Sequence, residues 1–334
     1  MPKETCLAAA LAILVAFLPT QLLGGGFADL DRLRLQFEAL ANAHPARVGI
    51  CAQGRVLPPI CVNGEQRFSL RSAVKIVIAA AVMQAVDEQR MALDDRITIR
   101  REDLSVNIQP TADIVVEKGA FETTIGDLVR RAVVDNDNAA ADVLIARLGG
   151  TSAIQAFLHK AGLQDIRIDR TERELQTEID GLVWMPEFVF PERLEEARNH
   201  VSEAERNAAF EAYLRDPRDT ATPRAMVAFL QRLATGTLVS AASTAYLLGV
   251  MEDTVNIPDG LRPGIPSDWT IGHRTGTSPT REGVNGVTND VGILTTPWGD
   301  RIAVAVFVAE SRADESERAA LIAAAARAIT SAYQ

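Results

Sequence analysis

A serine and a lysine stand three residues apart in the stretch RFSLRSAVKIVIAAAVMQAV. Ser72 lies at the start of a predicted helix, and Lys75 follows one turn later on the same face, so its amine can reach the serine oxygen. Lys75 is one of only four lysines, and its neighbours are apolar. Burial lowers the pKa of a lysine, and a neutral amine can accept a proton. The pair therefore predicts a serine nucleophile that needs no histidine, although the motif alone also arises by chance.

Other familiar catalytic patterns are missing from the sequence. No G-x-S-x-G or H-E-x-x-H motif is present, and the histidines show no setting typical of a triad. The four histidines are His44, His159, His200 and His273. We therefore expect neither a metal nor a cofactor.

Length and charge narrow the function classes. The chain has 334 residues, 47% of them hydrophobic, which is enough for one large core or two modest ones. Its net charge of −10 comes from interspersed acids and bases, with no basic stripe for a phosphate backbone. This excludes nucleic acid as an expected partner, and we expect a monomer that acts on a small molecule.

The N-terminus resembles a secretory signal. Residues 1–28 combine Lys3, an apolar stretch from Cys6 to Leu18 and small residues before a plausible cleavage after Ala28. The alternative is an uncleaved anchor, but a spanning helix needs about 20 apolar residues. We predict export to the periplasm or the medium, with no stable membrane span after cleavage.

The mature chain keeps two cysteines, Cys51 and Cys61, on either side of a Gly/Pro-rich turn. In an oxidising compartment they could form a disulfide across that turn. Two free buried thiols are the alternative.

Local periodicity predicts the elements that position the Ser72 pair. Strands are predicted near both chain ends, and helices between them. The predicted strands cover 47–53, 94–104, 268–278, 286–297 and 301–311, and the predicted helices cover 29–46, 72–90, 124–134, 138–148, 151–161, 223–235, 240–252 and 315–334. This order predicts one antiparallel sheet built from both chain ends, with an inserted helical part.

One segment does not fit a compact plan. Residues 177–216 carry five of the chain's aromatic residues, and Ser202 with Glu205 forms a capping box for a helix over about 203–214. The aromatic residues are Trp184, Phe188, Phe190, Phe210 and Tyr213. The segment is either a satellite core under a long loop or a functional lid.

Three more motifs follow the serine: DNDNAAADVLIARLGG at 135–150, DRTERELQ at 169–176 and HRTGTS at 273–278. With Ser72-x-x-Lys75, they resemble in order the serine, S-D-N, E-x-x-L-N and K-T-G elements of the class A serine β-lactamases, which are penicillin-recognising serine hydrolases. The resemblance covers most of the mature chain.

The resemblance implies an α/β (α+β) fold of the β-lactamase/transpeptidase type. A single catalytic domain would span 29–334, with a sheet subdomain over about 29–70 and 262–334. An all-helical subdomain would span about 71–261 and contain an insertion in the Ω-loop region at about 177–216.

The resemblance also implies catalytic roles. Ser72 would attack a lactam carbonyl, and Lys75 would act as a base or proton carrier in acylation. Glu172 would activate the water that hydrolyses the acyl-enzyme, with help from Gln176. Asn136 stands where the family has the serine of S-D-N.

The implied substrate site is formed by the K-T-G region and Asn138. The backbone N–H groups of Ser72 and Thr277 would form the oxyanion hole. Asn138 would donate its amide to the acyl side chain, and Arg274, Thr275 and Ser278 would receive the substrate carboxylate. The substrate-binding set is Asn138, Arg274, Thr275, Gly276, Thr277 and Ser278.

Three residues depart from the family pattern. Arg274 replaces a lysine and keeps the positive charge, and Gln176 replaces an asparagine with a longer amide. Asn136 replaces a serine, and an amide cannot easily relay a proton as a hydroxyl can. Without the resemblance, Asn138 could be a helix cap, Glu172 an exposed helix acid and Arg274 a strand-edge charge.

Arg170 and Asp219, at the two ends of the long loop, resemble the ion pair that pins the family's Ω loop. Their alternative reading is two solvated charges.

These motifs predict hydrolysis of the β-lactam amide bond through a serine acyl-enzyme. One alternative is an acyltransferase, peptidase or sensor that is acylated but deacylates slowly. Another is a binding protein on the same scaffold, which Asn136 and the insertion would favour.

Overall fold

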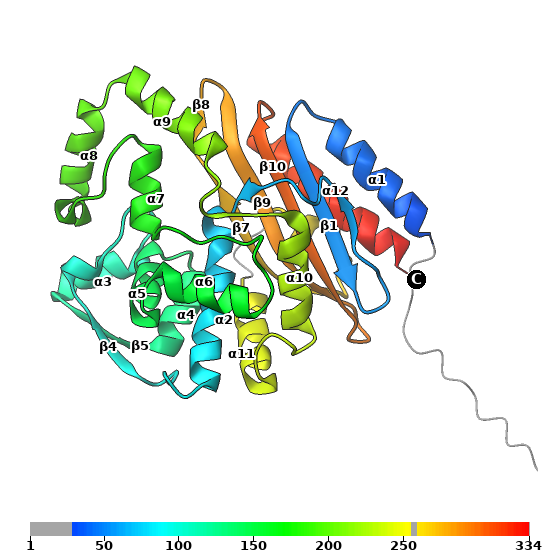
Figure 1. The fold of residues 1–334 in the computed structure, drawn as a ribbon, viewed down its shortest axis with the longest axis horizontal. Helices are drawn as coiled ribbons and strands as arrows, with labels where there is room; N and C mark the ends of the chain where they lie inside the picture. The colour runs from blue at the N-terminus through cyan, green and yellow to red at the C-terminus, as the bar shows by residue number, and fades with distance from the viewer. Residues whose placement is uncertain (1–28, 255–258, 334) are drawn as a thin grey trace, which may run out of the picture.

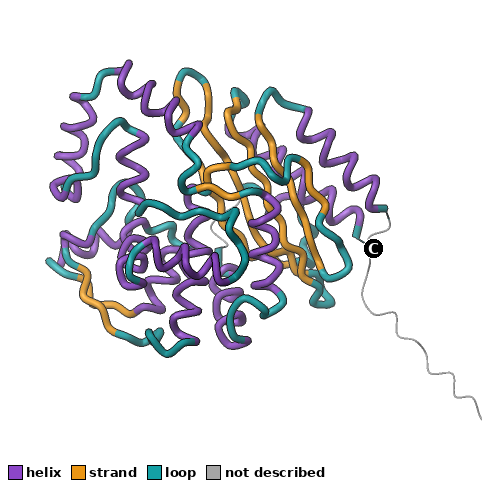
Figure 2. Tube along the Cα trace, viewed as in Figure 1, coloured by secondary structure: helices purple, strands orange, loops and turns teal. Residues whose placement is uncertain are grey.

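An antiparallel sheet built from both ends of the chain forms one half of the molecule, and helices form the other (Figures 1 and 2). The sheet runs in the order β2-β1-β10-β9-β7, with β8 paired to β9. Its strands are β1 (Arg47–Gly54), β2 (Ile60–Val62), β7 (Thr270–Thr277), β8 (Thr280–Arg281), β9 (Val284–Thr295) and β10 (Arg301–Ser311). The predicted fold class is confirmed. The computed structural model describes residues 29–254 and 259–333, so the predicted signal at 1–28 lies outside the described residues.

Alternation along β10 divides the interior into two cores. Val304 and Val306 face α1 (Leu30–Asn42) and α12 (Glu315–Ala332) in one buried cluster. Ala305 and its neighbour Phe307 belong to a second cluster, shared with the helical half. Because successive side chains of a strand point to opposite faces, a sheet covered by helices on both faces is apolar along its whole length.

The helical half is organised around α2 (Val74–Asp87), which is buried nearly all round. A helix that is apolar on every side belongs in the interior of a protein. The helices around it are α4 (Ile125–Val133), α5 (Asn138–Leu148), α6 (Thr151–Lys160), α10 (Pro223–Ala234) and α11 (Ala241–Glu252). All five agree with their predicted ranges to within about two residues. The predicted helix 72–90 is shorter than expected, because Ser72 lies in the 3-10 turn η1 (Arg71–Ala73).

Short elements complete the helical half. Two small antiparallel pairs, β3–β6 and β4–β5, tie its edges together. The predicted strand at 94–104 is shorter than expected: β4 covers only its middle, and a 3-10 turn follows. These elements are β3 (Phe68–Ser69), β4 (Arg96–Ile99), η2 (Arg101–Asp103), α3 (Pro110–Lys118), β5 (Phe121–Thr124), β6 (Thr220–Ala221) and η4 (Arg262–Gly264).

The segment after α7 (Glu172–Ile179) extends the helical half at one end of the molecule (Figure 1). It contains η3 (Pro186–Val189), α8 (Pro191–His200) and α9 (Glu203–Arg215). The predicted capping box is present, since the Ser202 hydroxyl accepts from the N–H of Glu205 and the Glu205 carboxylate accepts from the N–H of Ser202. We call residues 177–216 the insertion.

Cys51 and Cys61 lie directly opposite each other on β1 and β2 and form a disulfide. Of the two alternatives, a disulfide or two free thiols, the structure therefore has the disulfide. Within residues 29–254 and 259–333, no helix is both long and apolar enough to cross a bilayer.

Candidate active site

Ser72 and Lys75 lie where β7 meets the start of α2. Ser72 is the middle residue of η1, and Lys75 Nζ lies 3.4 Å from Ser72 Oγ. The Lys75 side chain is fully buried. The structure therefore brings the nucleophile and the amine within reach of each other, as their spacing predicted.

Oxygen atoms of the 135–150 motif surround the Lys75 amine. Nζ donates to Asn136 Oδ1 at 2.7 Å, to the Asn136 backbone oxygen at 3.0 Å and to Asn138 Oδ1 at 2.6 Å. Burial lowers the pKa of Lys75 to about 8, although the neighbouring Glu172 carboxylate raises it. An amine with this pKa is neutral in an appreciable fraction of molecules near pH 7.

Glu172 begins α7 and lies against the amine from the other side. Glu172 Oε1 is 3.5 Å from Lys75 Nζ, and both side chains are buried. Burial would raise the pKa of Glu172, but the charges of Lys75 and Arg71 outweigh it and hold the pKa below the usual value. Glu172 is therefore a carboxylate at neutral pH rather than the exposed helix acid that the local sequence would suggest.

Gln176 lies one turn after Glu172 on the same helix face. Gln176 Nε2 donates to Glu172 Oε2 at 3.1 Å. Glu172 Oε1 has no hydrogen-bond donor among the described residues apart from its ion pair with Lys75. This oxygen is the one left to accept a proton.

Close backbone contact places β7 beside Ser72. A side chain at Gly276 would lie 2.7 Å from the Leu70 backbone oxygen and 2.6 Å from Asn289 Oδ1, so only glycine allows this approach. The following residue, Thr277, is exposed, and Thr275 is half-buried.

Arg274 is the cationic residue of β7. Its side chain is buried, Nη1 donates to the Val133 backbone oxygen at 3.2 Å, and Nε has no partner among the described residues. Burial lowers the pKa of Arg274 to about 10, so it remains a cation at neutral pH. A buried cation with an unused donor suits an anionic group.

Ser278 follows the exposed Thr277 at the end of β7. Its buried hydroxyl accepts from the Val287 N–H at 2.8 Å and donates to the Pro279 oxygen at 3.2 Å. Both hydrogen bonds lie within the β7–β9 region, and a role for this hydroxyl in binding a carboxylate stays a prediction. Within the described residues, no group of His, Cys, Asp and Glu side chains could hold a metal ion.

Comparison with known proteins agrees with this geometry. A sequence profile of the beta-lactamase enzyme family matches residues 32–333. The chain belongs to the class A serine β-lactamase family. It is 29% identical to the beta-lactamase CTX-M-97 of Escherichia coli over 92% of this chain and 91% of that protein. It is 27% identical to the beta-lactamase VEB-1 of Pseudomonas aeruginosa over 85% of each chain.

Solved structures of the class A family have the same fold. The reconstructed last common ancestor of the class A β-lactamases of Gram-negative bacteria superposes with a TM-score of 0.71 at 32% identity, covering 90% of this chain and 98% of that one. A β-lactamase from Chitinophaga pinensis superposes with a TM-score of 0.73 at 25% identity, covering 90% and 99%.

In this class A family member, the insertion packs most of its aromatic residues. Phe210 and Tyr213 of α9 are buried against Leu175 and Ile179 of α7. Phe188 is buried with Val106 and Leu194, and Trp184 lies beneath the Arg173 guanidinium. Phe190 is 37% exposed, and the Arg101 guanidinium stacks on its ring. The satellite core, one of the two alternatives, is thus present, and a function as a lid stays a prediction.

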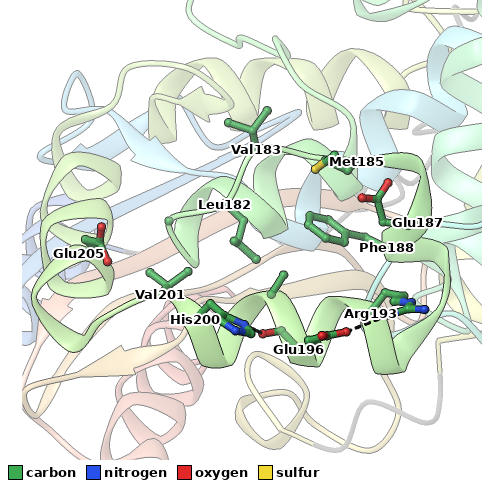
Figure 3. Close-up of a pocket in the computed structure, with 12 residues that line it drawn as sticks. Leu182, Val183, Met185, Glu187, Phe188, Arg193, Glu196, His200, Val201 and Glu205 are labelled. Atoms are coloured by element: carbon green, nitrogen blue, oxygen red, sulfur yellow. Dashed lines mark hydrogen bonds and ion pairs between the residues drawn. The ribbon is translucent and has the colours of Figure 1, made fainter.

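A pocket of about 760 Å³ lies within the insertion, between the chain after α7 and α8 (Figure 3). Its walls include Leu182, Val183 and Phe188, with Arg193 at one end paired to Glu196. None of the predicted site residues lines it.

The insertion is pinned by the predicted ion pair. Arg170 Nε donates to Asp219 Oδ2 at 2.6 Å, and both side chains are buried. Arg170 also pairs with Glu178 and Asp216. The pair is therefore confirmed as a buried network rather than two solvated charges.

Sequence reasoning missed Asp142, which anchors α7. One carboxylate oxygen accepts from the Glu172 N–H at 2.7 Å, and the other from the Arg173 N–H at 3.1 Å and the Ser105 hydroxyl at 2.8 Å. Free N–H groups at a helix start attract a carboxylate. The Thr171-x-x-Glu174 capping box could have revealed that α7 begins here, but no local signal points to Asp142.

Proposed function

We propose that this protein hydrolyses the β-lactam amide bond through a serine acyl-enzyme. Ser72 Oγ attacks the lactam carbonyl carbon, the C–N bond breaks, and the serine proton is transferred through Lys75 to the leaving nitrogen. The lowered pKa of Lys75 and its 3.4 Å distance to Ser72 Oγ support this role. The close approach of Gly276 to residue 70 supports an oxyanion hole formed by the N–H groups of Ser72 and Thr277.

Deacylation by Glu172 is the second half of the proposal. Glu172 takes a proton from a water molecule, the water oxygen attacks the acyl-enzyme ester, and Ser72 leaves with a proton. The observation that carries this step is the buried Glu172 carboxylate beside Lys75, with Oε1 free of any other donor. A slow-deacylating sensor or peptidase would not need this carboxylate.

Substrate binding is proposed for Asn138 and the β7 residues. Asn138 Nδ2 donates to the Val106 oxygen at 2.9 Å, which leaves its second amide hydrogen for the acyl side chain. Arg274, Thr275 and Ser278 would receive the substrate carboxylate. The Ser278 hydroxyl accepts from the Val287 N–H, and it would turn its hydrogen from the Pro279 oxygen to the substrate.

The test is Glu172→Gln with a chromogenic cephalosporin and intact mass spectrometry. We expect the variant to keep acylation and lose about 10²–10⁴-fold in deacylation, so that an adduct of the acyl mass accumulates. Glu174→Gln is the matched control, because glutamine also serves the capping box at that position. Equal turnover in Glu172→Gln and the parent would refute the assignment.

The parent protein separates the competing functions in the same experiment. Turnover supports a hydrolase, and a persistent adduct supports a sensor or peptidase. The absence of both turnover and an adduct would support a binding protein.

We also propose that residues 1–28 direct export and are removed after Ala28, leaving a monomeric catalytic domain of residues 29–334. The Cys51–Cys61 disulfide supports an oxidising compartment. The intact mass of the protein recovered from the periplasm or the medium tests the cleavage, and its sedimentation tests the oligomeric state.

A further inference from the structure

The side-chain amide of Gln176 is held in one orientation by donors from two directions. Its oxygen accepts from Arg71 Nη2 at 3.0 Å and from Asn107 Nδ2 at 2.9 Å. Its nitrogen is thereby directed at Glu172 Oε2, 3.1 Å away. If this amide rotated to exchange its oxygen and nitrogen, it would lose both hydrogen bonds and would place its own oxygen against the Glu172 carboxylate.

The first donor comes from the residue that precedes the nucleophile. Arg71 is buried, has a left-handed φ of 48°, and donates from Nε to the Thr277 backbone oxygen at 3.0 Å. Its guanidinium thus spans from the proposed oxyanion strand to Gln176. The planar fork of arginine allows both hydrogen bonds at once, which a lysine amine on a flexible stem cannot reproduce.

The second donor is held by the insertion. Arg198 of α8 donates from Nη2 to Asn107 Oδ1 at 2.9 Å and from Nε to Asp180 Oδ2 at 2.8 Å. With Asn107 Oδ1 bonded to Arg198, Asn107 Nδ2 is the group left to face Gln176. A side chain of the insertion therefore reaches Glu172 through Asn107 and Gln176.

We propose that Arg71 and the insertion's Arg198 are positioning residues for deacylation, which fix the Gln176 amide and through it the Glu172 carboxylate. The inference rests on the proposed role of Glu172. Within the described part of the chain, neither side chain hydrogen-bonds to Ser72 Oγ or Lys75 Nζ, so the effect falls mainly on deacylation and less on acylation.

The insertion arm of the clamp is tested with Arg198→Ala, Asn107→Ala and the double variant. Acylation and deacylation rates are measured separately by stopped flow and quenched-flow mass spectrometry. We expect each single variant to deacylate about 3–10-fold more slowly, from the loss of one partly exposed hydrogen bond. Arg198 acts through Asn107, so the double variant should be no slower than Asn107→Ala.

Arg193→Ala is the matched control, since Arg193 lies on the same helix and pairs only with Glu196 there. Its rates should equal those of the parent. An Arg198→Ala rate equal to that of Arg193→Ala, or additive losses in the double variant, would overturn the insertion arm.

The Arg71 arm is tested by the pH dependence of deacylation. The charged groups that face Glu172 are Lys75, Arg71, Arg274 and Asp142. Arg71→Met removes one cation, so the Glu172 carboxylate is protonated more easily. The fall of the deacylation rate on the acid side of its pH profile (the acid limb) should therefore move to higher pH. The deacylation rate should fall about 10–100-fold, as for a lost hydrogen bond to a charged group.

Arg71→Lys keeps the charge and loses the fork. It should keep the acid limb of the parent and still deacylate more slowly. If Arg71→Met does not fold, Arg71→Lys decides alone, and a deacylation rate equal to that of the parent overturns the Arg71 arm. If Glu172→Gln fails to trap an acyl-enzyme, the proposed function itself fails, which is a different outcome from fast deacylation in the Arg71 and Arg198 variants.

Discussion

Lys75 and Asn136 are joined by two hydrogen bonds from a single ammonium group. Nζ lies 2.7 Å from Asn136 Oδ1 and 3.0 Å from the backbone oxygen of the same residue. Asn136 has a left-handed φ of 60°, which lets both of its oxygens face the amine. The amide therefore orders Lys75, but it offers no hydroxyl to relay a proton.

Asn136→Ser should speed acylation. A serine hydroxyl can pass a proton from Lys75 to the leaving nitrogen, and general acid catalysis is typically worth about 10²–10⁴-fold. We expect the single-turnover acylation rate to rise at least about 10-fold. This is less than the full range because the variant also loses the ordering of Lys75 that Asn136 supplies. Lys75→Ala and Ser72→Ala should both stay near background. Slower acylation in Asn136→Ser would show that ordering matters more than relay.

Acylation should rise with pH through the titration of Lys75. Its pKa is lowered to about 8 by burial, and the amine accepts a proton only when neutral. The charged groups around it are Glu172, Arg274, Asp137 and Asp142. The acylation rate should climb between about pH 7 and pH 9 and then level off. A profile that is flat over this range would assign the base role in acylation to Glu172 instead.

Asp142→Asn should become more favourable to stability as pH rises. Burial and the Glu172 charge raise the pKa of Asp142 to about 7 in the folded protein. A carboxyl with a raised folded pKa stabilises most below its unfolded pKa and loses that stabilisation as pH rises through the folded value, by up to about 1.4 kcal/mol per pH unit.

The measurement is Tm for Asp142→Asn and the parent at pH 5, 6, 7 and 8. Asparagine keeps one acceptor for α7 and does not ionise, so its Tm minus that of the parent should increase up to about pH 7. A difference that does not vary with pH would mean that Asp142 ionises normally.

Phe210→Ala should destabilise the insertion. Phe210 is buried between α9 and α7, and truncation of a buried phenylalanine costs about 3–5 kcal/mol. Phe190→Ala is the matched control, because Phe190 is 37% exposed against 3% for Phe210, and its truncation should therefore cost less. Urea unfolding followed by circular dichroism compares the two variants. Equal losses would show that α9 is not anchored through its aromatic residues.

The sequence alone determined the order of the motifs and most of the helices and strands of the two halves, though not α3, α7 or α8. The helix spacing of Ser72 and Lys75 and the capping box at Ser202 and Glu205 are all local signals. They depend on backbone geometry within a few residues, so they can be recognised without knowledge of the fold. The antiparallel sheet was predictable from the order of elements, with strands at both chain ends and helices between them.

Which side chains actually meet was decided by the tertiary structure. The Ser278 hydroxyl accepts a hydrogen bond from the Val287 N–H of β9, nine residues further along the chain. Asp142 reaches the start of α7 from 30 residues away, and Arg71 reaches Gln176 from 105 residues away. Such contacts depend on the packing of distant elements, which no local spacing encodes. Sequence fixes which groups can donate or accept a hydrogen bond, and only the fold sets the distances and burial that give those groups their pKa values and their partners.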